Sequence, residues 1–165
     1  MVTDNTVNEI YPGLWLGDIN SASDLKFLRA KKISCIINCT LTIPFPKLPQ
    51  IKYRHRVPVK DNMKPEQIYL MYRMLDEAIN FIIKYLPEEQ ILIHCYAGRQ
   101  RSVAVVAGFL MKSADIKWDQ ALQCIRSKRE VAAVPQFNFE TALRQYQDDL
   151  DQLKYIKNIP VAEHG

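Results

Sequence analysis

The sequence predicts an α/β fold in which a central, mostly parallel sheet of about four to five strands is flanked by helices. Short apolar runs alternate with longer segments of helical periodicity, which is the pattern of strands connected by crossover helices. The two clearest runs, Ile33–Cys39 and Ile91–His94, are apolar almost throughout. Strands of a parallel sheet have such nearly continuous apolar sequences because helices cover both of their faces.

The first half of the chain divides into short elements. Residues 10–16 surround a Pro-Gly pair at positions 12 and 13, which indicates a small hairpin. Residues 23–30 begin with a serine suited to capping and predict a short helix. A proline cluster at 44–49 is typical of a loop. Residues 52–59 alternate in polarity and predict a further strand.

The second half is mainly helical. A long helix is expected to begin at Pro65, because proline is favoured in a first turn, and to end before Pro87. Apolar residues recur along it at steps of three and four. After the strand at 91–94, the sequence predicts three helices, over 102–112, 118–129 and about 136–154.

Size and composition are those of an ordinary single-domain protein. The chain has 165 residues, 48% of them hydrophobic and 24% charged, with a net charge of +4. This mild positive charge suits an anionic substrate and does not require nucleic acid as a partner. We expect one domain over residues 1–165, with a core at about 9–150.

The cysteines indicate a reducing compartment. The chain has four, and Cys35 and Cys39 would lie too far apart along one strand to form a disulfide. Cys124 lies in a helix and is expected to be buried. No Cys-x-x-Cys pair indicates a metal, no apolar run is long enough to span a bilayer, and no cofactor is expected. The cytoplasm is therefore the expected location, with the nucleus, or the virion and host cytoplasm for a viral protein, as alternatives.

The most informative motif follows the strand at 91–94. Residues 94–102 read His-Cys-Tyr-Ala-Gly-Arg-Gln-Arg-Ser and lead directly into a predicted helix. The amides of such a loop and the N-terminus of its helix converge on a bound anion. The same field favours the thiolate form of Cys95, and Arg101 offers a planar fork of donors for two phosphoryl oxygens. The motif predicts a phosphate cradle with a nucleophile at its base.

This motif resembles the Cys-x5-Arg sequence of the protein tyrosine phosphatase superfamily. Three further segments, Pro12–Gly17, Ile33–Cys39 and Ala107–Met111, are similar to segments of its dual-specificity branch, as is Val134–Phe139. The resemblance covers roughly residues 9–150. It implies a phosphatase-type sheet with the phosphate loop between the central strand and a helix, and a small enzyme similar to cellular atypical and large-DNA-virus members.

The resemblance also implies roles for the residues of the loop. Cys95 would be the nucleophile and Arg101 would bind the phosphoryl oxygens. Ser102 would stabilise the departing thiolate, and His94 would hold the loop and help to keep the cysteine ionised. The substrate phosphate would contact the loop residues Tyr96, Ala97, Gly98, Arg99, Gln100 and Arg101.

Protonation of the leaving oxygen requires a carboxylic acid on another loop. Asp61 is the strongest candidate, because it follows a predicted strand, precedes the helix that begins at Pro65 and lies upstream of Cys95 at the spacing of the dual-specificity branch. The alternative interpretation of Asp61 is a simple turn cap. His55 and His164 are expected at the surface.

The predicted function is a metal-independent phosphomonoesterase that uses a phosphocysteine intermediate on phosphotyrosine and phosphoserine or phosphothreonine in proteins. The expected partner is a phosphorylated protein, and the chain would be a monomer or a homodimer. Arg99 leaves open a non-protein substrate, either a phosphoinositide or an RNA 5′-triphosphate. An inactive phosphate-binding module is a further alternative.

Overall fold

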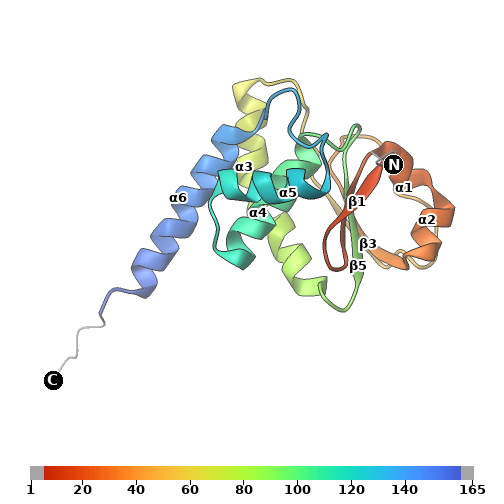
Figure 1. Cartoon of the computed structure of the whole chain (residues 1–165), viewed down its shortest axis with the longest axis horizontal. Helices are drawn as coiled ribbons and strands as arrows, with labels where there is room; N and C mark the ends of the chain where they lie inside the picture. Colours follow the sequence, from red (N-terminus) through yellow and green to blue (C-terminus); the bar gives the residue numbers. More distant parts are fainter. Residues whose placement is uncertain (1–5, 161–165) are drawn as a thin grey trace.

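A computed structural model describes residues 6–160 of the chain (Figure 1). Five strands form one sheet in the order β1-β2-β5-β3-β4. They are β1 (Val7–Tyr11), β2 (Leu14–Gly17), β3 (Ile33–Asn38), β4 (Tyr53–Arg56) and β5 (Gln90–His94). The hairpin β1–β2 is antiparallel, and the other neighbours are parallel. The predicted fold class is confirmed, with β5 at the centre of the sheet.

Within residues 6–160, six helices cover the sheet. They are α1 (Ile19–Ser23), α2 (Leu25–Ala30), α3 (Pro65–Tyr85), α4 (Arg101–Ala114), α5 (Trp118–Lys128) and α6 (Glu140–Lys157). In Figure 1, α1 and α2 lie on one side of the sheet and α3, α4, α5 and α6 on the other. Each side has its own apolar core, and the larger one surrounds α4, whose residues 102–111 are all buried.

One predicted helix is two helices in the structure. The sequence predicted a single helix over 23–30 that starts at Ser23, whereas α1 ends at Ser23 and α2 begins at Leu25. Asp24 separates them, because its extended backbone ends α1 and its carboxylate accepts a hydrogen bond from the Phe27 N–H at the start of α2. Asp18 caps α1 in the same way, through the Ser21 N–H.

Two expectations about burial were wrong. Cys124 is exposed, because α5 turns Ala121 and Ile125 into the core and leaves Cys124 on its other side. His55 is half-buried and stacks on Phe81, with ring centroids 5.4 Å apart, and burial lowers its pKa. His164 lies outside the described residues.

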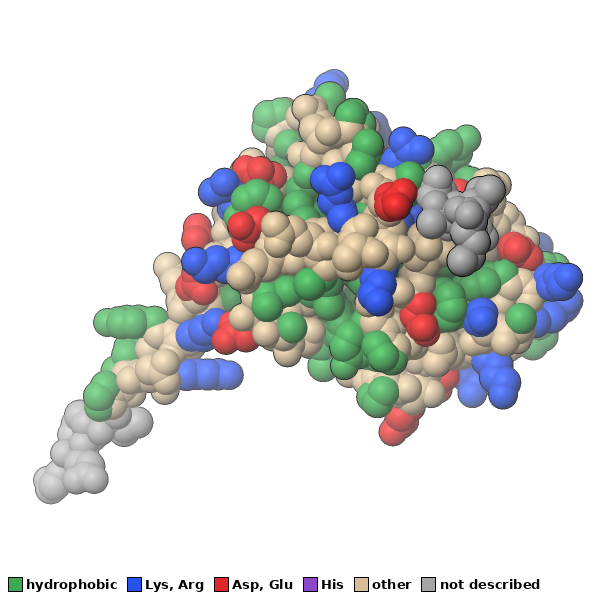
Figure 2. Space-filling view, in the orientation of Figure 1, with side chains coloured by type: hydrophobic (Ala, Val, Ile, Leu, Met, Phe, Trp, Pro, Cys, Tyr) green, Lys and Arg blue, Asp and Glu red, His purple; other side chains and the backbone are tan. Residues whose placement is uncertain are grey.

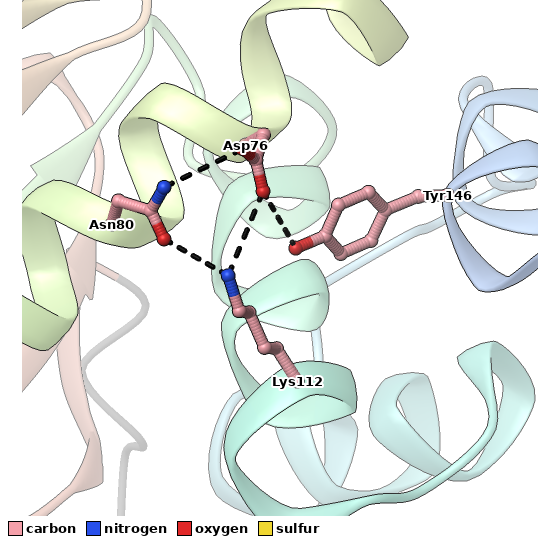
Figure 3. A network of polar contacts seen from close by, with 4 residues as sticks. All are labelled: Asp76, Asn80, Lys112 and Tyr146. Carbon is pink, nitrogen blue, oxygen red and sulfur yellow. Dashed lines mark hydrogen bonds and ion pairs between the residues drawn. The ribbon is translucent and has the colours of Figure 1, made fainter. Parts of the chain in front are cut away.

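A polar network ties three helices together (Figure 3). Lys112 of α4 lies 3.6 Å from the Asp76 carboxylate of α3 and donates to Asn80 over 3.0 Å. The Tyr146 hydroxyl of α6 donates to the same carboxylate over 3.5 Å. Burial, with Asp76 beside it, raises the pKa of Tyr146, so the phenol remains a donor.

The end of α6 projects from the body of the molecule (Figures 1 and 2). Residues 151–157 are all exposed, including Leu153, Tyr155 and Ile156. The apolar side chains of α6 therefore pack against the core only as far as Leu150. Among the described residues, no helix is long and apolar enough to cross a membrane.

Candidate active site

The loop at the carboxyl end of β5, residues 95–101, forms a tight cradle around the Cys95 thiol. We call it the Cys95 loop. The thiol is buried, with 2% of the residue exposed. The Gly98 N–H donates to Sγ over 3.2 Å, and the Ser102 hydroxyl lies 3.1 Å from the same sulfur. A thiolate at this position therefore has two hydrogen-bond donors directed at it.

The tight turn of the Cys95 loop depends on Gly98. Its φ of +65° lies in the left-handed region, which side chains with a Cβ adopt at a cost. A Cβ at this position would also approach the carbonyl oxygen of Gly17 and the guanidinium of Arg129 to 2.6 Å each. Backbone conformation and packing together require glycine here.

Arg129 holds the outer side of the Cys95 loop. The residue is only 1% exposed, and its guanidinium donates to the carbonyl oxygens of Gly98 over 2.9 Å and Ala97 over 3.4 Å. A further donor contacts the Asn8 side chain over 2.8 Å. When loop amides turn toward a ligand, carbonyls turn outward and need donors. Arg129 supplies them, and the sequence-based reasoning did not identify this residue.

Arg101 begins α4, and two nitrogen atoms of its guanidinium have different surroundings. One terminal nitrogen, Nη1, donates to the Val59 carbonyl oxygen over 2.9 Å, which fixes the guanidinium against the loop that carries Asp61. The Nε atom is buried and has no partner among the described residues. A buried, unpaired donor on a cation is costly, so this atom marks a position that an anionic oxygen would satisfy.

His94 is buried and neutral. Its Nδ1 lies 3.2 Å from the Cys95 carbonyl oxygen, so this nitrogen carries the proton and donates to the loop backbone. Burial lowers the pKa of His94 to about 4. The imidazole therefore holds the loop through a hydrogen bond, and at neutral pH it has no charge with which to stabilise a thiolate.

A second thiol lies beside the nucleophile. Asn38 of β3 pairs with His94 of β5, and the Cys39 N–H donates to the His94 carbonyl oxygen over 2.8 Å. Cys39 and Cys95 therefore directly follow the ends of two adjacent strands. Burial, and the charge of Cys95 next to it, raise the pKa of Cys39 well above its usual value. Cys39 is thus a protonated neighbour at neutral pH.

Asp61 lies on an exposed loop between β4 and α3, residues 57–64, which we call the Asp61 loop. Its carboxylate accepts a hydrogen bond over 2.9 Å from the Asn138 side chain. The loop backbone is held at the peptide group between Val59 and Lys60. Arg101 donates to the Val59 carbonyl, and the Lys60 N–H donates to the Gln67 side chain over 2.8 Å. The structure thus connects the Asp61 loop to the Cys95 loop through Arg101.

The remaining predicted residues differ in their exposure. Tyr96, Ala97 and Arg99 are exposed, and Arg99 lines a shallow pocket outside the loop together with Asp18. Gln100 is buried instead. Its side chain donates to the Gln136 carbonyl over 2.7 Å and accepts from the Asn138 N–H over 2.8 Å, so it faces the chain rather than a ligand.

No group of three His, Cys, Asp or Glu residues that could hold a metal ion occurs within residues 6–160. The chemistry offered by this arrangement is therefore that of a thiol, a guanidinium, loop amides and a carboxylic acid on a neighbouring loop.

Comparison with known proteins decides the family. The model of the dual specificity phosphatase catalytic domain matches residues 14–149. Human dual specificity protein phosphatase 22 is 33% identical over 144 residues, which is 87% of this chain and 74% of the relative. The chain belongs to the dual specificity phosphatase family. It is a protein phosphatase of the tyrosine and dual-specificity type.

Other comparisons agree with this assignment. The crystal structure of DUSP15 is 31% identical, with a TM-score of 0.73 over 92% of this chain and 97% of that one. Human dual specificity protein phosphatase 2 is 31% identical over 141 residues, 84% of this chain, but the chain spans only 43% of that longer protein.

Two residues that contact this site were not identified from the sequence. Arg129 and Asn138 both contact predicted site residues directly. For Arg129 the only signal in the sequence was a basic residue at the end of a helix. Asn138 lies in the family-like segment 134–139, but nothing in its spacing indicated a contact with Asp61.

Proposed function

We propose that this phosphatase hydrolyses phosphomonoesters in proteins through a phosphocysteine intermediate on Cys95, without a metal. The observation that carries the proposal is the environment of the Cys95 sulfur, which receives the Gly98 N–H over 3.2 Å and lies 3.1 Å from the Ser102 hydroxyl. These contacts favour the thiolate, which is the nucleophilic form. The buried, unpaired Nε of Arg101 supports a phosphoryl group bound above it.

In the first step, the thiolate attacks phosphorus and the bond from phosphorus to the ester oxygen breaks. Negative charge on the equatorial oxygens is stabilised by Arg101 and by the amides of residues 96–101, which are fixed before the reaction begins. The leaving oxygen takes the proton of the Asp61 carboxyl group. Protonation avoids the expulsion of a strongly basic alkoxide or phenoxide.

In the second step, water attacks phosphorus and the phosphorus–sulfur bond breaks. The Asp61 carboxylate accepts a proton from this water, and inorganic phosphate is released. The Ser102 hydroxyl donates a hydrogen bond to the thiolate as it leaves, which is consistent with its position 3.1 Å from Sγ. The enzyme returns to its starting ionisation state.

The proposed substrates are phosphotyrosine and phosphoserine or phosphothreonine in proteins. The segment between β3 and Asp61 is short, so no long insertion deepens the site for phosphotyrosine alone. Tyr96 and Arg99 at the mouth of the loop are exposed, at 63% for Tyr96. We propose a single catalytic domain with its core at about 9–150, which the family match over 14–149 supports. The free cysteines support a reducing compartment such as the cytoplasm.

The test is phosphate release, in the presence of a chelator, from phosphotyrosyl and phosphothreonyl peptides, phosphoinositide vesicles and 5′-triphosphorylated RNA. Turnover of both peptides that Cys95→Ser abolishes is the expected result. Turnover of lipid or RNA alone would show that the substrate is not a protein, in line with the exposed Arg99. Binding of the peptides without turnover would overturn the enzymatic proposal.

A further inference from the structure

The side chain of Asp61 reaches the Cys95 loop through two residues. Gln100, immediately before Arg101, binds the segment 134–139 with both ends of its side-chain amide, at the Gln136 carbonyl over 2.7 Å and the Asn138 N–H over 2.8 Å. The Asn138 side chain then donates from Nδ2 to Oδ1 of Asp61 over 2.9 Å. These hydrogen bonds therefore connect Gln100 of the Cys95 loop, through Asn138, to the Asp61 carboxylate.

The two halves of this connection differ in burial. Gln100 is 6% exposed, whereas Asp61 lies in solvent and Asn138 is half-buried between them. Neighbouring elements add support, because Ala133 donates its N–H to the Arg99 carbonyl over 2.8 Å and Phe139 is buried at the start of α6. The segment 134–139 is thus a fixed platform from which Asn138 reaches an otherwise exposed side chain.

We propose that Asn138 is a positioning residue for the acid step, and this inference rests on the proposed function of Asp61. An exposed aspartate samples several rotamers, and only some of them direct a carboxyl oxygen toward the leaving group. By binding Oδ1, the Asn138 amide selects one orientation and leaves Oδ2 to carry the proton that is transferred. Gln100 fixes Asn138 relative to the nucleophile, so the position of the acid is set relative to that of the nucleophile.

The variant Asn138→Ala isolates this effect. It removes the side-chain donor but keeps the backbone N–H that binds Gln100, so the platform is retained. Gln136→Ala is the matched control, because Gln136 lies in the same segment and its exposed side chain contacts Met63 rather than Asp61. Thermal unfolding of both variants establishes that the fold is intact.

The readout is the dependence of turnover on the leaving group. For phenyl phosphate, whose phenolate leaves poorly, Asn138→Ala should lower kcat/KM, which reports the steps up to departure of the leaving group, by about 10-fold, whereas for 4-nitrophenyl phosphate the loss in kcat/KM should be less than about 2-fold. Gln136→Ala should change neither. In an Asp61→Asn background, where no proton can be donated, Asn138→Ala should have no further effect.

Equal losses on the two substrates would overturn the inference, because a damaged cradle slows every substrate alike. A further loss in the Asp61→Asn background would overturn it as well. These results are distinct from a failure of the proposed function, in which the wild-type enzyme turns over neither substrate or Asp61→Asn does not slow phenyl phosphate. That failure would overturn both proposals together.

Discussion

The Cys95 loop and the Asp61 loop lie next to each other and are held in opposite ways. The Cys95 loop has Cys95, Gly98 and Gln100 buried, and its backbone is bound by Arg129, His94 and the Cys95 sulfur. The Asp61 loop is exposed from Lys60 to Lys64, and the Asp61 side chain is held by one amide, that of Asn138. Of the two groups proposed for one reaction, the Cys95 thiol therefore lies on a loop held by several hydrogen bonds, and the Asp61 carboxylate is held by one.

This difference follows from what each step demands. Charge develops at the phosphoryl group, and fixed dipoles stabilise it best when they need not reorganise, so a rigid loop is favourable there. The acid must meet leaving groups of different size and location, which an adjustable side chain on an exposed loop can do. Substitutions in the Cys95 loop should accordingly affect every substrate, and substitutions around Asp61 should affect substrates according to their leaving groups.

The largest effect is expected at Arg101. Lysine keeps the positive charge but loses the planar fork that binds two oxygens, so Arg101→Lys should lower kcat/KM by about 10²–10³-fold. The loss should be similar for phenyl and 4-nitrophenyl phosphate. A steady-state comparison of the two substrates measures this, and a loss confined to phenyl phosphate would place Arg101 with the acid rather than the phosphoryl group.

Arg129→Met should come next and should act through stability. It leaves the Gly98 carbonyl in a buried site without its donor, with an expected cost of roughly 3 kcal/mol in unfolding free energy. Chemical denaturation measures this cost. Turnover of the folded fraction should fall equally for good and poor leaving groups. An unchanged unfolding free energy would show that the contacts of Arg129 with the Cys95 loop do not stabilise it.

The substitution Asp61→Asn should separate the two loops most clearly. The amide keeps an acceptor for Asn138 but cannot donate the proton, so kcat/KM for phenyl phosphate should fall by about 10²-fold. The kcat/KM for 4-nitrophenyl phosphate should fall only a few-fold, because nitrophenolate leaves without help and kcat/KM does not include the later step in which Asp61 acts as base. Initial rates with both substrates at concentrations well below KM measure kcat/KM and test this, and equal losses would argue that Asp61 does not act as the acid.

The smallest expected effect concerns acid stability. His94 has a pKa of about 4 in the folded protein and 6.5 as its ordinary value. The unfolded chain therefore binds the proton first, and stability is lost as the pH falls from about 6.5 toward 4. The loss from this residue should reach about 2 kcal/mol at about pH 5.

The variant His94→Asn keeps a donor for the Cys95 carbonyl and removes the titration. Its unfolding free energy should change less between about pH 7 and pH 5 than that of the wild type. His55, whose pKa is also lowered by burial, acts in the same direction in both proteins and cancels in the comparison. Parallel pH profiles would contradict the account of His94.

The sequence predicted the Cys95 loop well and the supports of both loops poorly. The apolar strand, the glycine, the arginine and the start of α4 are consecutive, so local pattern alone locates Cys95 at the end of β5. Arg129 and Asn138 contact the site across 31 and 77 residues of sequence. Contacts of that range depend on how α5 and α6 pack, and no periodicity within either helix encodes it.

The errors have similar causes. Cys124 was expected in the core because cysteine is usually buried, yet the helical face of Ala121 and Ile125 decides the matter. The helix predicted over 23–30 was divided because Asp24 accepts a hydrogen bond from the backbone, a preference that the apolar pattern of the segment does not reveal. Each outcome depends on the place of one residue relative to its near neighbours, the face of α5 for Cys124 and the start of α2 for Asp24.

The central claim is that Cys95 becomes phosphorylated during turnover, and the phosphoenzyme can be observed directly. A phosphotyrosyl peptide is mixed with the enzyme, the reaction is quenched in acid within the first turnovers, and the intact mass of the protein is measured. The account predicts an added phosphoryl group that maps to Cys95 and is absent in Cys95→Ser. Full turnover of the peptide by Cys95→Ser, or a phosphoryl group on another residue, would contradict it.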